Sequence, residues 1–146
     1  MARSLDIETL IEDAFISLLP TYVQSGTTVI RWEDIKDKEE TPLVKVAATL
    51  NDDEPGTVNC FIASNVLVDI AVFTSKRIDE QGRTGNTIRG QVRDLLKQSD
   101  VYDLLNTSAA GLKVYNNGVI PQTSSNDSDS KVWQKQITVL IVATTE

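Results

Sequence analysis

The chain of 146 residues has the length of one globular domain, and its 40% hydrophobic and 24% charged residues are typical of a folded protein rather than a disordered one. The net charge of −7 argues against a general nucleic-acid binder, because sequence-independent binding to the phosphate backbone would need a local basic patch. The chain has no histidine, which excludes Ser-His-Asp and Cys-His catalysis and zinc sites that contain histidine. Its single cysteine, Cys60, cannot form a disulfide within the chain and suits a reducing compartment.

The hydropathy pattern does not favour insertion into a membrane. The longest uncharged stretch, residues 14–30, includes Pro20, Gly26 and several polar side chains, so it is not the run of ~20 apolar residues that a membrane helix needs. The N-terminal residues interleave acidic with apolar side chains and lack the apolar centre of a signal peptide. We therefore expect synthesis in the cytoplasm and one domain over residues 1–146.

The first element is expected to be a helix. Residues 7–19 carry apolar side chains at the spacing of one helical stripe, which predicts an amphipathic helix. Ser4 or Asp6 is the expected N-cap. Pro20 is expected to end the helix, because proline cannot supply the next backbone donor.

Strands are expected next, because the hydropathy period changes to two. The alternation predicts short strands over 28–34 and 43–50, with an all-charged link over 36–40 between them. A turn over 51–56 leads into the main strand, 58–75, which is apolar on both alternate faces. Eighteen residues exceed an ordinary strand, so we expect either a break near Asn65 or a part that projects from the domain.

The second half of the chain begins with a polar link over 76–85. Apolar spacing over 88–96 predicts a helix capped by Thr84 or Asn86, and a short helix is expected to follow over 99–105.

A closing hairpin is expected after the helices, with strands over 112–116 and 131–144 joined by a Ser/Asn/Asp-rich loop over 118–130. The order of elements predicts an α+β fold: a mostly antiparallel sheet of about five strands with helices packed on one face.

Three segments invite a chemical interpretation. The oxygen-rich runs 51–54 and 126–129 could hold a hard cation, but neither fits an EF-hand loop, and turn formation explains the same residues. Residues 82–87 resemble a phosphate loop but lack its Gly-Lys-Ser/Thr ending, so a helix cap is the better account. We therefore expect no catalytic residue, no metal and no cofactor.

Other features suggest contacts rather than catalysis. Arg89, Arg93 and Lys97 form one row on the predicted helix, which is either a solvated face or a match for an acidic neighbour. Trp32 and Trp133 could anchor an interface or pack in the core. Asp69, in an apolar strand, needs a partner if it is buried, and an Arg or Lys partner would make it structural.

Together, these elements resemble the tail terminator, or tail completion, proteins of tailed bacteriophages. The resemblance covers most of the chain and lies in patterns of apolar and polar positions. The segments that carry it are the opening helix 7–19, the strand 66–75, the link 76–83, the helix 88–96 and the final strand 133–143.

The resemblance implies a ring of identical subunits, commonly six, at the head-proximal end of the virion tail. Such a ring caps the tail tube, ends its polymerisation and offers a docking surface to the head connector or neck protein. Its partners would be other copies of itself, the tail tube protein and, in a contractile tail, the sheath protein. Genome DNA would pass through without specific binding, helped by the acidic charge.

Within this interpretation, residues 69–85 are the hypothetical arm that reaches across a subunit boundary. The candidate residues for the ring or tube interface are Asp69, Lys76, Arg77, Asp79, Glu80, Arg83, Arg89, Arg93 and Trp133.

Other functions stay open at this point. The nearest alternative is a head-side neck or closure subunit. A non-viral adaptor would bind one partner through the basic row, and a small metal-dependent hydrolase would need the two acidic runs to converge.

Overall fold

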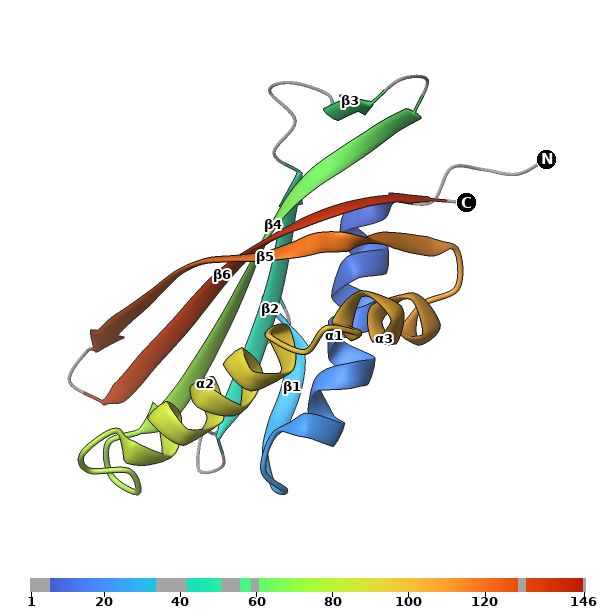
Figure 1. The fold of residues 1–146 in the computed structure, drawn as a ribbon. Coiled ribbons are helices and arrows are strands. Elements are labelled where there is room, and N and C mark those ends of the chain that lie inside the picture. The colour runs from blue at the N-terminus through green and yellow to red at the C-terminus, as the bar shows by residue number, and fades with distance from the viewer. Residues whose placement is uncertain (1–5, 34–41, 51–55, 59–60, 129–130, 146) are drawn as a thin grey trace.

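The computed structural model describes residues 6–33, 42–50, 56–58, 61–128 and 131–145 (Figure 1). The elements in chain order are α1 (Ile7–Tyr22), β1 (Thr28–Arg31), β2 (Leu43–Leu50), β3 (Gly56–Val58), β4 (Phe61–Ser75), α2 (Arg83–Leu96), α3 (Val101–Ser108), β5 (Leu112–Ser128) and β6 (Val132–Thr145). The predicted charged link 36–40, the acidic run 51–54 and Cys60 lie outside the described residues.

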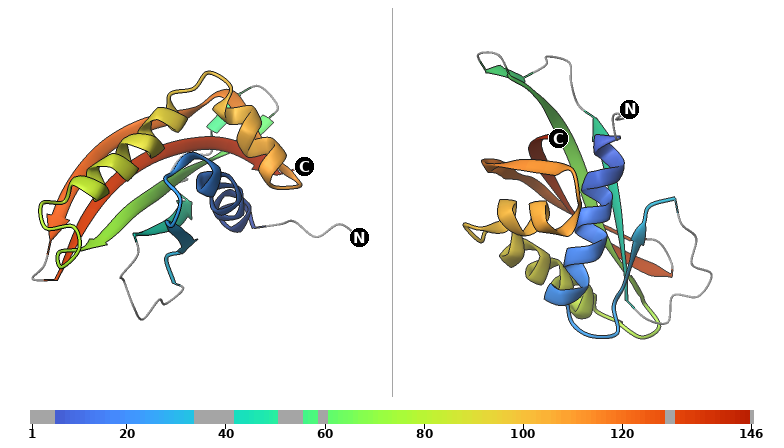
Figure 2. Two further views of the ribbon diagram at one scale, coloured as in Figure 1. Left: turned by 90° about the horizontal axis from the view of Figure 1, so that it is seen from below. Right: turned by 90° about the vertical axis from the view of Figure 1, so that its right-hand side faces the viewer.

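The main sheet has the strand order β1-β2-β4-β6-β5, and β3 pairs with the beginning of β4. All described pairings are antiparallel except the short parallel pair of β1 with β2. The three longest strands curve together, and the views from below and from the side show the helices gathered against the sheet (Figure 2). The predicted α+β class, with a mostly antiparallel sheet, is confirmed.

The core lies between one face of this sheet and the three helices. Alternate residues of β4 and β6, such as Val68 and Val139, are fully buried there. Helix α1 contributes Phe15 and α2 contributes Val92 to the same cluster, and both are fully buried. Because the strand period is two, the opposite face of β4 and β6 points away from these helices.

Helix α1 begins as predicted but ends later. The Asp6 carboxylate accepts a hydrogen bond from the Glu8 backbone N–H at 3.1 Å, so Asp6 is the N-cap. The prediction that Pro20 ends the helix is wrong, because α1 continues through Pro20 to Tyr22. Pro20 lies near the end of the helix, with only two helical residues after it, and the last turn still closes with Val23 N–H donating to the Leu19 carbonyl.

The main strand differs from its prediction in two ways. Val58 belongs to β3, which pairs with β4 at Phe61, so the predicted strand 58–75 contains parts of two strands. Strand β4 does not break at Asn65, which pairs with Val142 in a continuous ladder. Instead, β4 changes partner, from β3 over 61–63 to β2 from residue 66 onward.

The beginning of β4 forms a projecting ribbon with β3. We call residues 56–58 and 61–63 the β3–β4 ribbon. Strand β6 pairs with β4 only from Ser64 onward, so the ribbon lies beyond the end of that pairing. Figure 1 shows the ribbon extending past the rest of the sheet. The predicted projection is therefore confirmed, at the start of the strand.

The final hairpin is longer than predicted. The expected loop over 118–130 is wrong for residues 118–128, because β5 runs from Leu112 to Ser128 along β6. The register shifts between Val114 and Val119 and again between Pro121 and Thr123. Such bulges interrupt the apolar alternation by which a strand is predicted. A solvent-exposed edge strand can also have the polar composition that is typical of a loop.

Helix α3 protects the outer edge of β5. The Asn106 side-chain amide donates to the Val114 carbonyl at 3.3 Å, and its oxygen accepts from the Val114 N–H at 2.6 Å. The side chain thus binds a strand residue much as a neighbouring strand would, which blocks pairing with another chain at this position.

Two predicted boundaries also move. The first strand ends at Arg31 rather than at residue 34, and the short helix after α2 is α3, which extends to Ser108 rather than ending at 105.

Candidate interaction surfaces

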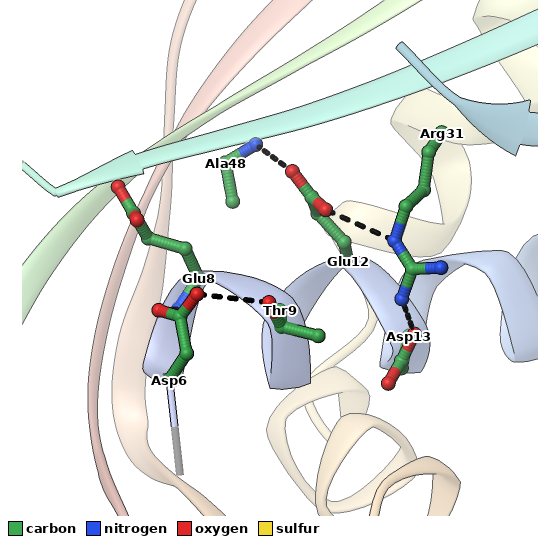
Figure 3. A network of polar contacts seen from close by, with 7 residues as sticks. All are labelled: Asp6, Glu8, Thr9, Glu12, Asp13, Arg31 and Ala48. Atoms are coloured by element: carbon green, nitrogen blue, oxygen red, sulfur yellow. Dashed lines mark hydrogen bonds and ion pairs between the residues drawn. The ribbon is translucent and has the colours of Figure 1, made fainter. Parts of the chain in front are cut away.

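A network of polar contacts joins α1 to the sheet (Figure 3). The Glu12 carboxylate accepts from Arg31 Nε at 3.2 Å and from the Ala48 backbone N–H at 3.0 Å. Asp13 pairs with Arg31 Nη2. Glu8 accepts from the Leu50 N–H at 2.6 Å. The carboxylates therefore bind backbone donors and one arginine, which fastens the helix to β1 and β2.

Within the described ranges, no group of three or more His, Cys, Asp or Glu residues is arranged to hold a metal ion. Of the two oxygen-rich runs, 51–54 lies outside the described residues, as does Asp129. Asn126 and Asp127 lie in strand β5, where the Asp127 carboxylate accepts from the Ser128 N–H at 2.8 Å.

Asp79 anchors the start of α2. Its carboxylate accepts from the backbone N–H groups of Thr84 and Gly85, each at 3.1 Å. Gly82 precedes the helix with φ of 72°, a left-handed conformation that suits glycine. Burial raises the pKa of the Asp79 carboxyl, but the helix N–H groups stabilise its ionised form more strongly, so the pKa lies below the usual value.

The predicted caps of this helix are therefore wrong. Thr84 and Asn86 both lie inside α2, and the cap comes from Asp79, which is five residues before Thr84. The bare amides that suggested a phosphate loop are already bound by a carboxylate of the same chain. This contact leaves the segment without the anion site that its spacing resembled.

Trp133 lies beside the same turn. Its indole Nε1–H donates to the Asp79 carbonyl at 2.9 Å. The ammonium groups of Lys76 and Lys135 lie 4.5 and 5.0 Å from the ring centroid. Three of the predicted interface residues, Lys76, Asp79 and Trp133, are thus brought together, but in a contact that holds the turn 76–82 against β6.

Arg89 and Arg93 reach from α2 to β5. Arg89 Nη1 donates to the Ser125 carbonyl at 2.9 Å and to Asn126 Oδ1 at 2.6 Å. Arg93 Nη2 donates to Ser124 Oγ at 3.3 Å. Burial and repulsion by Arg93 lower the pKa of Arg89. These two arginines of the predicted row thus contact a polar strand of the same chain, through hydrogen bonds that stay exposed.

Near the C-terminal end of α2, these contacts border a pocket. Its volume is about 260 Å³, and Arg93 and Lys97 lie on one side of it, opposite Thr123 and Ser124 of β5. Leu96 and Ile137, each 3% exposed, also line it. We call this the α2–β5 pocket.

The face of the sheet opposite the core carries none of the three described helices. We call it the helix-free face. It presents a row of aligned residues across three strands, Leu67, Leu140 and Ile120, and Ile120 is 41% exposed. On the same face, Asp69 Oδ1 accepts from Thr138 Oγ1 at 2.7 Å. The expected Arg or Lys partner of Asp69 is thus replaced by a hydroxyl.

Trp32 extends this surface at the edge of the sheet. Its ring meets the Phe73 ring edge-on, with the two centroids 6.0 Å apart. Trp32 is 36% exposed. Lys45 Nζ lies 5.9 Å from the Phe73 centroid. An exposed aromatic beside apolar strand residues is typical of a contact surface.

The predicted arm over 69–85 is wrong in its position. Residues 69–75 lie in the central strand β4, and 76–82 form a turn fastened by Asp79 and Trp133. The remaining candidates, Arg77, Glu80 and Arg83, are exposed at this turn; Glu80 and Arg83 line an open depression of about 280 Å³. The turn also carries Ile78, which is 60% exposed.

Sequence reasoning missed Glu12, Arg31 and Asn106. Each side chain acts on a backbone or side-chain group at least 8 residues away. A carboxylate within an amphipathic helix and an arginine at a strand end are signals of a polar contact, but neither indicates its partner.

No helix in the described ranges combines the length and the apolar character required to cross a membrane. Compared with protein-family models, the chain matches none, and no curated protein is significantly similar to it in sequence.

Proposed function

We propose that this protein is a structural subunit that assembles with copies of itself into a ring, commonly of six, and that the ring caps the head-proximal end of a bacteriophage tail tube. The resemblance of its elements to tail terminator proteins supplies the role in the tail. The helix-free face supplies the observation that carries self-association. It combines the aligned row Leu67, Leu140 and Ile120 with the exposed ring of Trp32.

Burial of such a face favours association, since each Å² of apolar surface removed from water contributes about 25 cal/mol. The β3–β4 ribbon supports the same proposal. A two-stranded ribbon has little stability of its own in water, so contact with another subunit would stabilise it. A closed ring joins two different surfaces of each subunit, which the helix-free face and the opposite side of the sheet provide.

A capping ring of this kind acts by contact alone. One side of the ring binds the last ring of the tube protein, and its other side offers no site for a further tube subunit. Polymerisation therefore ends, and that outer side is left to bind the head connector. The net charge of −7 on each subunit would repel phosphate, so DNA would slide through the opening rather than adhere.

The oligomeric state of the purified chain tests self-association. We expect native mass spectrometry and negative-stain microscopy to show closed rings, and Ile120→Asp to convert them to monomers, because a carboxylate would be buried in an apolar contact. Ile78→Asp is the matched control, since Ile78 is also exposed but lies on the 76–82 turn. A wild-type chain that remains monomeric at high concentration contradicts the proposal.

The role in the tail requires a different experiment. Particles made without this protein are examined by electron microscopy. Overlong tails without heads are expected if the ring ends tube growth. Tails of normal length beside leaking, filled capsids would instead assign the protein to the neck, and normal infectious particles would remove it from the head–tail junction altogether.

A further inference from the structure

The α2–β5 pocket is distinguished by its charge. Arg89, Arg93 and Lys97 lie along one side of α2, and none of them has a carboxylate within 4.0 Å in the described part of the chain. Arg89 and Arg93 instead donate to neutral oxygens of β5. By contrast, Arg31 on the other side of the molecule pairs with two carboxylates.

The helix dipole does not balance this charge. The C-terminal end of a helix carries about half a negative elementary charge, against three cations in the row. Repulsion by Arg93 contributes to the lowered pKa of Arg89, which also indicates that the positive charge of the row is not fully balanced. In a chain with a net charge of −7, such a surface attracts an acidic neighbour.

The pocket also has the lining that a carboxylate side chain would use. Arg93 and Lys97 provide charged donors, and the hydroxyl groups of Thr123 and Ser124 lie on the opposite side. Leu96 and Ile137 provide an apolar wall for the methylene groups that carry a carboxylate. At about 260 Å³ the space accommodates one side chain rather than an extended segment.

We propose that the α2–β5 pocket binds a carboxylate side chain of a second copy of this chain. The inference rests on the proposed ring. It assigns the pocket as the positively charged surface in the contact between neighbouring subunits. Another copy is the favoured occupant because the proposed ring places one beside this side of the sheet, and its 21 Asp and Glu residues supply carboxylates that complement Arg93 and Lys97. The pocket opens beside β5, on the side of the sheet opposite the helix-free face, as a contact between two different surfaces requires.

Charge reversal at one exposed lysine tests this assignment. Lys97→Glu is compared with Arg83→Glu, which makes the same change of charge at an exposed position on the same helix outside the pocket. Sedimentation velocity at low and high NaCl measures self-association of the full chain, and circular dichroism checks that each variant folds. We expect Lys97→Glu to weaken association about tenfold at low salt and Arg83→Glu to change it less than about twofold. Arg93→Gln is expected to weaken it as well.

A second measurement examines the ligand chemistry directly. Tetraglutamate peptide is added to dilute, isotopically labelled protein, and we expect it to shift the backbone amide signals of Thr123 and Ser124 in the wild type but not in Lys97→Glu. Inorganic phosphate that shifts the same signals while tetraglutamate does not would overturn the carboxylate assignment.

The outcomes separate this inference from the proposed function. Rings that are equally stable in Lys97→Glu and the wild type overturn the pocket while leaving the ring intact. Equal weakening by Lys97→Glu and Arg83→Glu also overturns it, because net charge would then be the cause. A wild-type chain that stays monomeric refutes the ring and the second copy together.

Discussion

Asp79 is expected to be the most sensitive carboxylate of the 76–82 turn. The variant Asp79→Ala removes two hydrogen bonds from the helix N–H groups of Thr84 and Gly85, and these donors lie where water has little access. The loss of an N-cap costs about 0.5–2 kcal/mol, and a hydrogen bond to a charged group contributes about 1.5–3 kcal/mol. Because the two accounts describe the same contact, we expect a loss of about 2–3 kcal/mol in the free energy of unfolding.

The assay is urea unfolding at neutral and acidic pH. In a thermal unfolding experiment, a loss of this size would lower the melting temperature of a domain of ~150 residues by about 5–10 °C. Asp79→Asn is expected to lose less, since its amide oxygen still accepts from one N–H. Glu80→Ala is the control, because Glu80 is exposed and adjacent.

The measurements at acidic pH test the role of the Asp79 carboxylate most directly. Folding lowers the pKa of Asp79, so its contribution is complete above the unfolded pKa of ~3.9 and is lost as the pH falls through the folded value. The difference between the wild type and Asp79→Ala should therefore be constant from pH 7 to about pH 5 and shrink below pH 4. A difference that persists unchanged at pH 2, or a variant as stable as the wild type at pH 7, refutes the reasoning.

Three further substitutions test the fold. Glu12→Ala should lower the free energy of unfolding by about 2 kcal/mol in denaturant titration, because it leaves the Ala48 N–H without its acceptor; an unchanged midpoint would contradict the role of Glu12. Asn106→Ala should cost about 2 kcal/mol and expose the β5 edge, which light scattering would detect as concentration-dependent aggregation. Gly118→Ala should cost about 3 kcal/mol by calorimetry, because a Cβ at residue 118 would lie 2.5 Å from the Val142 carbonyl oxygen; a stable variant would show that the bulge can move.

Much of the fold could be predicted from local patterns. The helical stripe of α1 and the alternation of β2 are strong because every position agrees with one period, and Asp6 caps α1 as expected. The errors arise where a local signal has two meanings. A proline is expected to end a helix, but Pro20 lies two residues before the end of α1. The polar run of β5 is typical of a loop but also of an edge strand.

The candidate surfaces were harder to predict. Arg89 and Arg93 were found as a cationic row, but their contacts with β5 join residues at least 31 positions apart. For Trp133 the sequence allows either an interface anchor or a core residue, and neither alternative indicates its hydrogen bond to the Asp79 carbonyl, which spans 54 positions. Such contacts depend on how the strands are ordered, which no local spacing encodes.

The sequence by itself therefore determined the class of the protein: a folded α+β chain without histidine chemistry, with acidic charge and recognisable helices and strands. These properties follow from composition and from periods of two and 3.6 residues, which act within a few positions. Only the tertiary structure decided that Asp79 caps α2, that the ribbon projects at the start of β4 rather than after it, and that the α2 cations flank a pocket. These features arise when distant segments pack together, because burial and strand pairing select partners in space rather than along the chain.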